Sequence, residues 1–71
     1  MEVINLRNWL KELRVSKNLT QENLANLIGI SRTMITEIEN GNASPSIQSA
    51  KKIAYILGFS WIKFFDDGQV A

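Results

Sequence analysis

The stretch Thr20–Gly41, T-Q-E-N-L-A-N-L-I-G-I-S-R-T-M-I-T-E-I-E-N-G, predicts two short helices that meet at a sharp corner. Apolar residues recur at helical spacing in its first half and define one buried face, made of Leu24, Ala25, Leu27 and Ile28. Gly29 follows, where a helix can end in the left-handed conformation that costs glycine little. Ser31 is a suitable N-cap for the second helix.

The second helix, from about Ser31 to Asn40, has two different faces. Ile35 and Ile38 are expected to point inward, and Asn40-Gly41 ends the helix. The outward residues are polar: Arg32, Thr33, Thr36 and Glu37. A helix, a tight glycine-containing turn and a second helix with a polar outer face form the layout of a helix-turn-helix.

The residues that carry this layout also carry a family resemblance. They are Thr20-Gln21, Leu24-Ala25, Gly29, Ser31, Ile35, Ile38-Glu39, Gly41, Pro45-Ser46, Ala54 and Leu57-Gly58. In this order the set resembles the lambda-repressor/Cro (XRE-type) helix-turn-helix proteins over roughly residues 6 to 65. The resemblance implies an all-α, compact five-helix lambda-repressor-like domain that binds double-stranded DNA, with the helix-turn-helix at helices two and three.

The remaining helices follow from the same periodicity. Leu6, Trp9, Leu10 and Leu13 predict a buried face for a first helix at residues 5–16, with Arg7, Lys11, Glu12 and Lys17 in solvent. A fourth helix is expected from about Ser46 to Leu57, on the face made of Ile47, Ala50, Ile53, Ala54 and Leu57. Gly58 ends it, and Ser60 caps a short fifth helix through Phe65. We therefore expect residues 1–71 to form a single domain, with its core at about 5–65 and a polar tail at 66–71.

Composition excludes several functions. The 71 residues include no histidine and no cysteine, which leaves no imidazole base, thiolate or soft metal site. We therefore expect no enzyme activity, no cofactor and no metal. The chain is too short to add a ligand-sensing domain, and no small-molecule ligand is expected. No apolar run is long enough for a membrane span, so a cytoplasmic protein without membrane contact is predicted.

Bulk charge does not argue for DNA binding. The net charge is +1, and the segment 18–45 holds one cation, Arg32, against three glutamates. This is not the strongly basic balance typical of nucleic-acid-binding domains. The prediction of DNA binding rests on the motif. Phosphate affinity must come from few side chains and from backbone amides at helix N-termini.

The resemblance implies which residues contact base edges in the major groove. They are Arg32, Thr33 and Glu37, with Thr36 close by. The planar fork of Arg32 can grip guanine O6 and N7, and Glu37 can accept from a cytosine amino group. The alternative is a plain solvated surface, which we disfavour for Arg32 and Thr33 and only narrowly for Glu37.

The phosphate contacts are expected at helix ends. Gln21 begins helix two of the domain, at about residues 20–28, where backbone amides and the helix dipole favour a phosphate. In this family the matching glutamine also braces the first reading residue, here Arg32. The other predicted phosphate contacts are Ser31, Asn40, Gly41, Asn42 and, as weaker candidates, Lys17 and Asn18.

Two further sets of residues have predicted structural roles. In similar proteins an arginine late in helix one bridges a glutamate late in helix three, which predicts a pair between Arg14 and Glu39. Large apolar residues off the core stripes suggest a dimer or partner patch, made of Tyr55, Ile56, Trp61, Ile62 and Phe65. The alternative is that several of the large apolar residues at this end, notably Phe64 and one neighbour, simply complete the core.

The sequence therefore predicts a sequence-specific transcriptional regulator, most simply a repressor, that binds a palindromic operator as a homodimer, at least on DNA. The first alternative is an antitoxin or other protein-binding module of the same fold that uses the C-terminal apolar patch. The second is an interaction domain whose third helix never meets DNA.

Overall fold

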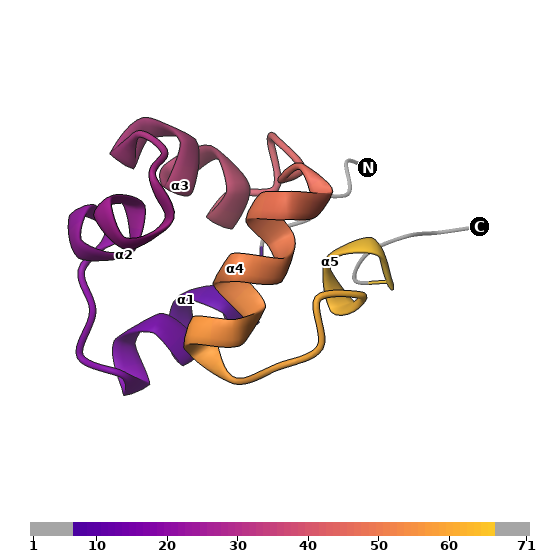
Figure 1. The fold of residues 1–71 in the computed structure, drawn as a ribbon, viewed down its shortest axis with the longest axis horizontal. Coiled ribbons are helices and arrows are strands. Elements are labelled where there is room, and N and C mark those ends of the chain that lie inside the picture. The colour runs from indigo at the N-terminus through magenta and orange to yellow at the C-terminus, as the bar shows by residue number, and fades with distance from the viewer. Residues whose placement is uncertain (1–6, 67–71) are drawn as a thin grey trace, which may run out of the picture.

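A computed structural model describes residues 7–66, and in this range the chain is all-α with five helices (Figure 1). They are α1 (Asn8–Ser16), α2 (Gln21–Ile28), α3 (Arg32–Glu39), α4 (Ile47–Leu57) and α5 (Lys63–Asp66). The predicted fold class is confirmed. None of these helices has both the length and the apolar character needed to cross a membrane.

The helices pack so that α3 is held from two sides. It contacts α2 across the corner and α1 through its second half, while α4 packs against α2. In Figure 1, α2 and α3 lie on one side of α4, and α5 lies on the other. The outer surface of α3 is left without a neighbour among the other helices.

Short polar side chains and glycines set the helix ends. The hydroxyls of Thr20, Ser31 and Ser46 accept from the third backbone amide of α2, α3 and α4, at 3.0, 3.1 and 3.1 Å. Gly29 and Gly58 end α2 and α4 at φ 88° and 80°, in the left-handed region that side chains disfavour. The corner predicted at Gly29 and Ser31 is confirmed.

The buried face of α1 is rotated from the prediction. Its most buried residues are Leu10 and Arg14, and Arg7 just before the helix is 6% exposed, whereas Trp9 and Leu13 are only half-buried. The expectation that Arg7 is solvated is therefore wrong. Arg7, Leu10 and Arg14 share one face because they follow the i, i+3, i+7 spacing. The predicted start at residue 5 and the role of Leu6 lie outside the described residues.

Two residues placed on buried stripes are exposed. Leu27 is 59% exposed and Ile47 is 56% exposed, because each stands at the edge of its apolar stripe where no other helix covers it. The fifth helix begins at Lys63 rather than just after Ser60, and a turn occupies Trp61-Ile62. Of the predicted tail, Asp66 ends α5 and 67–71 are outside the described range.

An aromatic cluster closes the core beside α5. Phe64 is buried, as the alternative to the apolar patch predicts for this residue, and its ring centre lies 5.5 Å from the Trp9 ring and 5.4 Å from the Phe59 ring. Trp9 and Phe59 meet edge to face at 5.1 Å. Edge-to-face contacts of this kind add to the free energy gained from burial. Phe64 thereby fastens the C-terminal part of the chain to α1.

We predict that Phe64→Ala lowers the free energy of unfolding by about 3 to 5 kcal/mol, because it removes a fully buried ring and leaves a cavity. Urea denaturation followed by circular dichroism measures this change. Leu27→Ala is the control, since the Leu27 side chain is 59% exposed and its loss should change little. Equal effects of the two substitutions would contradict the packing.

Candidate nucleic-acid interface

The outward side of α3 carries the predicted reading residues. Arg32 and Thr33 are exposed, and Thr36 and Glu37 are half-buried. The opposite side is held in the core by Ile35, Ile38 and Glu39. The first turn of α3 therefore faces solvent, while the opposite side of the helix is fixed in the core.

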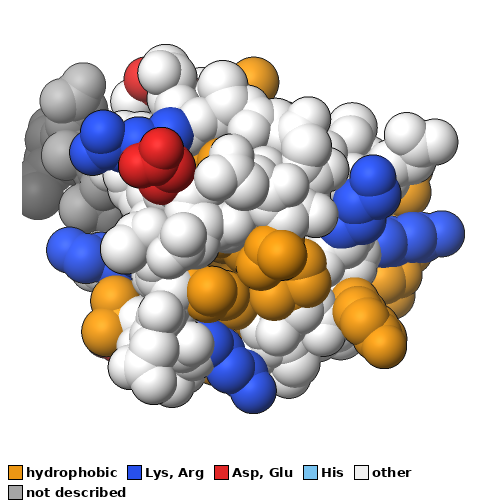
Figure 2. All heavy atoms as spheres, turned by 60° about the vertical axis from the view of Figure 1, so that its left-hand side comes forward, with side chains coloured by type: hydrophobic (Ala, Val, Ile, Leu, Met, Phe, Trp, Pro, Cys, Tyr) orange, Lys and Arg blue, Asp and Glu red, His pale blue; other side chains and the backbone are white. Residues whose placement is uncertain are grey.

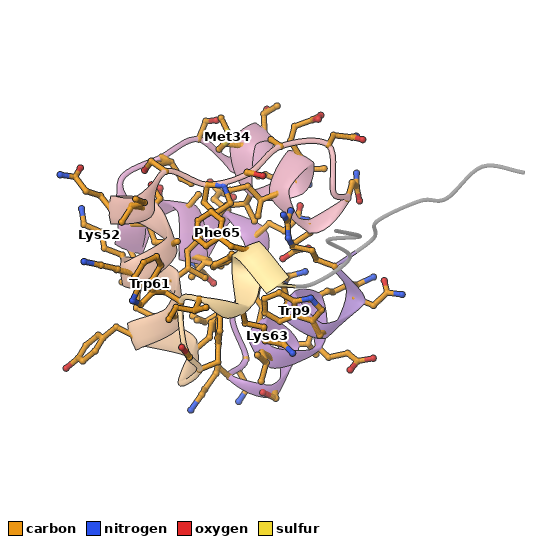
Figure 3. The ribbon with its side chains drawn as sticks, turned by 90° about the vertical axis from the view of Figure 1, so that its right-hand side faces the viewer. Trp9, Met34, Lys52, Trp61, Lys63 and Phe65 are labelled. Carbon is orange, nitrogen blue, oxygen red and sulfur yellow. The ribbon has the colours of Figure 1, made fainter. Side chains whose placement is uncertain are left out.

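Met34 is a member of this surface that the sequence reasoning did not assign. It is 41% exposed and follows Thr33 in the first turn of α3, and Figure 3 shows it on α3 in the upper part of the view. A helical projection places it off the Ile35–Ile38 stripe, which is the signal that identifies it. An exposed, flexible thioether can contact the methyl group of thymine in a major groove.

A buried ion pair holds α3 on α1. Arg14 Nε donates to Glu39 Oε2 at 2.6 Å, and Arg14 Nη2 donates to Glu39 Oε1 at 3.3 Å. The two side chains are 9% and 5% exposed. Arg14 Nη1 also donates to the Leu19 carbonyl at 2.8 Å, so the pair fixes the loop before α2 as well.

Gln21 extends this network to the outer side of α3. Its Nε2 donates to Glu39 Oε1 at 3.0 Å, and its Oε1 accepts from the Thr36 hydroxyl at 2.9 Å. The glutamine was expected to brace Arg32. Its carboxamide instead bonds to Thr36 and Glu39, which lie one and two turns beyond Arg32 on α3.

A groove of about 740 Å³ opens at the start of α2. Its lining includes Lys11, Asn18, Gln21 and Arg32, with Glu22 at the same opening. The backbone amide of Asn23 donates to the Thr20 hydroxyl, whereas the backbone amides of Gln21 and Glu22 make no hydrogen bond within the described residues. Two unbonded amides and nearby cations are what a phosphate oxygen requires.

The loop after α3 has a different arrangement. The amides of Asn40, Gly41 and Asn42 donate to carbonyls of Thr36, Ile38 and Glu37, at 2.9, 3.1 and 2.9 Å. A phosphate contact at this loop would therefore fall to the exposed side chains of Asn40 and Asn42. Gly41 has a φ of 79° and serves to end the helix.

Three other predicted phosphate contacts lie near helix ends. Ser31 is exposed, but its hydroxyl is engaged as the cap of α3. Lys17 and Asn18 are exposed just after α1, where Asn18 adopts a φ of 59°. Asn18 lines the groove, and Lys17 adjoins it in the sequence.

Arg7 is a structural residue that the sequence reasoning missed. Its Nη1 donates to the carbonyls of Ile38 and Ala43 at 2.7 and 2.9 Å, and its backbone amide donates to the Glu39 carbonyl at 2.8 Å. Its guanidinium lies 5.6 Å from the centre of the Phe64 ring. Arg7 thus caps the last turn of α3 and joins it to α5.

The proposed patch on α4 and the segment after it is only partly exposed. Tyr55, Ile62 and Phe65 are 89%, 51% and 39% exposed, whereas Ile56 and Trp61 are half-buried against the core. Trp61 and Phe65 meet edge to face at 5.8 Å, and Figure 3 shows Phe65 on α5 and Trp61 next to that helix.

Charge is spread thinly over the side of the molecule that carries α2 and α3. Figure 2 shows a largely uncharged surface there, with Lys and Arg side chains toward its margins and few carboxylates. Arg7 and Arg14 are buried, so the exposed cations near the groove are Lys11, Lys17 and Arg32. Within residues 7–66, no cluster of acidic side chains is arranged to hold a metal ion.

Comparison with known proteins gives a consistent picture. The profile of the helix-turn-helix family HTH_3 matches residues 10–64. The transcriptional regulator YqaF of Bacillus subtilis is 47% identical over 62 residues, which are 87% of this chain and 82% of YqaF.

Of two further relatives, one is named as an activator and the other as a repressor. The transcriptional activator BcrR of Enterococcus faecalis is 47% identical over 45 residues, 63% of this chain and 22% of BcrR. The phage CTXphi transcriptional repressor RstR of Vibrio cholerae is 30% identical over 60 residues, 84% of this chain and 54% of RstR.

A solved structure has the same fold. The HTH_3 family transcriptional regulator from Vibrio cholerae superposes with a TM-score of 0.66 at 39% identity. The match covers 90% of this chain and 36% of the Vibrio chain, so the present sequence spans about a third of that protein.

We predict that Arg14→Ala costs about 3 to 5 kcal/mol of unfolding free energy, because it leaves the Glu39 carboxylate buried without its cation. Thermal or urea unfolding measures the loss. Lys11→Ala removes an exposed cation from the same helix and is the control, with little expected change. An Arg14→Ala protein as stable as the control would show that the pair does not hold α3.

Proposed function

This chain belongs to the helix-turn-helix family of DNA-binding transcriptional regulators, and we propose that it represses transcription by binding a palindromic operator as a homodimer. Members of this family are regulators rather than enzymes. The observation that carries the proposal is the outward side of α3, where Arg32 and Thr33 are exposed on a helix that is fixed from beneath. We place the protein in the cytoplasm, where bacterial and archaeal DNA is found.

We call the outward side of α3 the reading face, because its side chains are the ones that can reach base edges. A major groove admits one α-helix, and side chains near the helix N-terminus reach the base edges. Arg32 offers a guanidinium fork to guanine, Thr33 a methyl or hydroxyl, and Glu37 an acceptor for a cytosine amino group. Met34 adds an apolar contact to a thymine methyl.

The phosphate contacts bracket this helix. On one side lie the start of α2, with Gln21 and its unbonded neighbouring amide, and the exposed Lys17 and Asn18. On the other side lie the side chains of Asn40 and Asn42. Such contacts fix the register of the protein on the duplex, while the reading face selects the sequence. Few cations take part, so affinity should fall only modestly with added salt.

The dimer is proposed to form through α4 and α5. Tyr55, Ile62 and Phe65 are exposed there, and Ile56 and Trp61 form the partly buried floor. This face is separate from the outward side of α3, so both can be occupied at once. A two-fold axis through it would place two reading helices about one DNA turn, roughly 34 Å, apart.

The same apolar face supports a second candidate function. A protein-binding module such as an antitoxin would use Trp61 and Phe65 for its partner and keep DNA binding for autoregulation. The face also carries Lys51, whose ammonium lies 5.2 Å from the Trp61 ring centre.

Between repression and activation, we propose repression, because a protein can repress simply by occupying a promoter.

Selection of bound duplexes from a random pool tests the proposal. We expect two inverted half-sites whose centres are about 10 base pairs apart, or a multiple of one turn. Light scattering of the complex should give two chains for each operator. A single half-site bound by one chain would overturn the dimer, and no enrichment at all would overturn specific DNA binding.

We predict that Arg32→Ala lowers operator affinity by about tenfold or more and relaxes selectivity at one guanine position, because a bidentate contact is lost. Competition binding against operators with single substitutions measures both effects. Arg32→Lys keeps the charge without the fork and serves as the control, retaining phosphate attraction but not the guanine preference. An unchanged preference in both variants would remove Arg32 from the reading face.

A further inference from the structure

We propose that Thr36 is a positioning residue that locks the Gln21 carboxamide in place, so that Gln21 presents one N–H to a DNA phosphate. This inference rests on the proposed DNA-binding function and deepens it. It replaces the expectation that Thr36 contacts a base. The carrying observation is the bond between the Thr36 hydroxyl and Gln21 Oε1 at 2.9 Å, across 15 residues of sequence.

The orientation of the carboxamide follows from its two partners. Glu39 forms an ion pair with Arg14, and the carboxylate of an ion pair only accepts hydrogen bonds. The Nε2 end of Gln21 must therefore face Glu39 Oε1, at 3.0 Å, because the flipped amide would set two oxygens against each other. The Oε1 end is then directed at Thr36.

The Thr36 hydroxyl has one hydrogen to give. Two acceptors lie within reach, Gln21 Oε1 at 2.9 Å and the Arg32 carbonyl at 3.2 Å. The shorter bond, to Gln21, completes a chain of contacts from Arg14 through Glu39 and Gln21 to Thr36. With its hydrogen committed and its side chain half-buried, Thr36 is poorly placed to donate to a base.

These two hydrogen bonds leave one N–H group of the Gln21 carboxamide available. A carboxamide has two N–H groups, and Glu39 accepts one of them. Gln21 lines the groove at the start of α2, together with Lys11 and Arg32. The remaining N–H is thus held in a fixed position beside the groove, where it can donate to a phosphate oxygen without first losing rotational freedom.

The inference separates two effects on DNA binding. A phosphate contact adds affinity for every duplex, whereas a base contact changes the preference at one position. Loss of the Thr36 hydroxyl should therefore weaken binding to the operator, to its single-base variants and to random duplex by the same factor.

The test compares the full chain with Thr36→Val and Thr36→Ser, using the selected operator, its single-base variants and a random-sequence duplex. Thr36→Val is expected to weaken binding to all of them by roughly fivefold, the effect of one hydrogen bond. Thr36→Ser, which keeps the hydroxyl, should restore affinity. Thr33→Ala is the control on the same helix, because it removes both the methyl and the hydroxyl that can reach a base, and it should instead change the preference at one base pair.

A second readout needs no DNA. The two side-chain amide protons of Gln21 should have separate, dispersed NMR signals that Thr36→Val shifts and Thr36→Ser preserves. A changed base preference in Thr36→Val, or unmoved Gln21 signals, would overturn the inference. If the wild-type chain binds no duplex, the DNA-binding proposal and the phosphate role both fail, and the Gln21 signals still decide whether Thr36 positions this side chain.

Discussion

The ion pair between Arg14 and Glu39 is the interaction on which the arrangement of α1, α2 and α3 depends. Burying two charges is costly, and the cost is recovered only where the geometry is good and further hydrogen bonds satisfy the remaining atoms. Here Arg14 makes two contacts to the carboxylate and one to the Leu19 carbonyl, and Gln21 adds another donor to Glu39. Because the partners come from three segments, the network specifies how α3 sits on its neighbours rather than simply adding stability.

The apolar core also holds α3 in place on its neighbours. Leu24, Ile35 and Ile38 are almost completely buried where α2 and α3 meet, and Phe64 closes the opposite side against Trp9 and Phe59. Arg7 connects the two regions, since it bonds to the end of α3 and lies over the Phe64 ring. Small domains bury little surface for each residue, so contacts that join distant segments matter more here than in a larger protein.

The local features of this fold could be predicted from the sequence, and the long-range polar contacts could not. Gly29 and Ser31 act within their own turn, so residue type alone places the corner. The sequence predicts Arg7 in solvent because charged side chains are usually exposed, and nothing near Arg7 in the sequence reveals the carbonyls at the end of α3 to which it donates. Leu27 and Ile47 fit apolar stripes, but whether the edge of a stripe is covered depends on neighbouring helices. The bond from Thr36 to Gln21 joins residues 15 positions apart, and only the packing of α3 on α2 brings them together.

These contacts hold the outward side of α3 in a fixed position, and we propose that this side enters a major groove of DNA. Dimethyl sulfate footprinting on the selected operator tests this most directly, since the reagent methylates guanine N7 in the major groove and adenine N3 in the minor groove. The account predicts protection of guanine N7 within each half-site, with adenine N3 there as reactive as in free DNA. Protection of adenine N3 alone, with every guanine N7 still reactive, would place the protein in the other groove and contradict the assignment of α3.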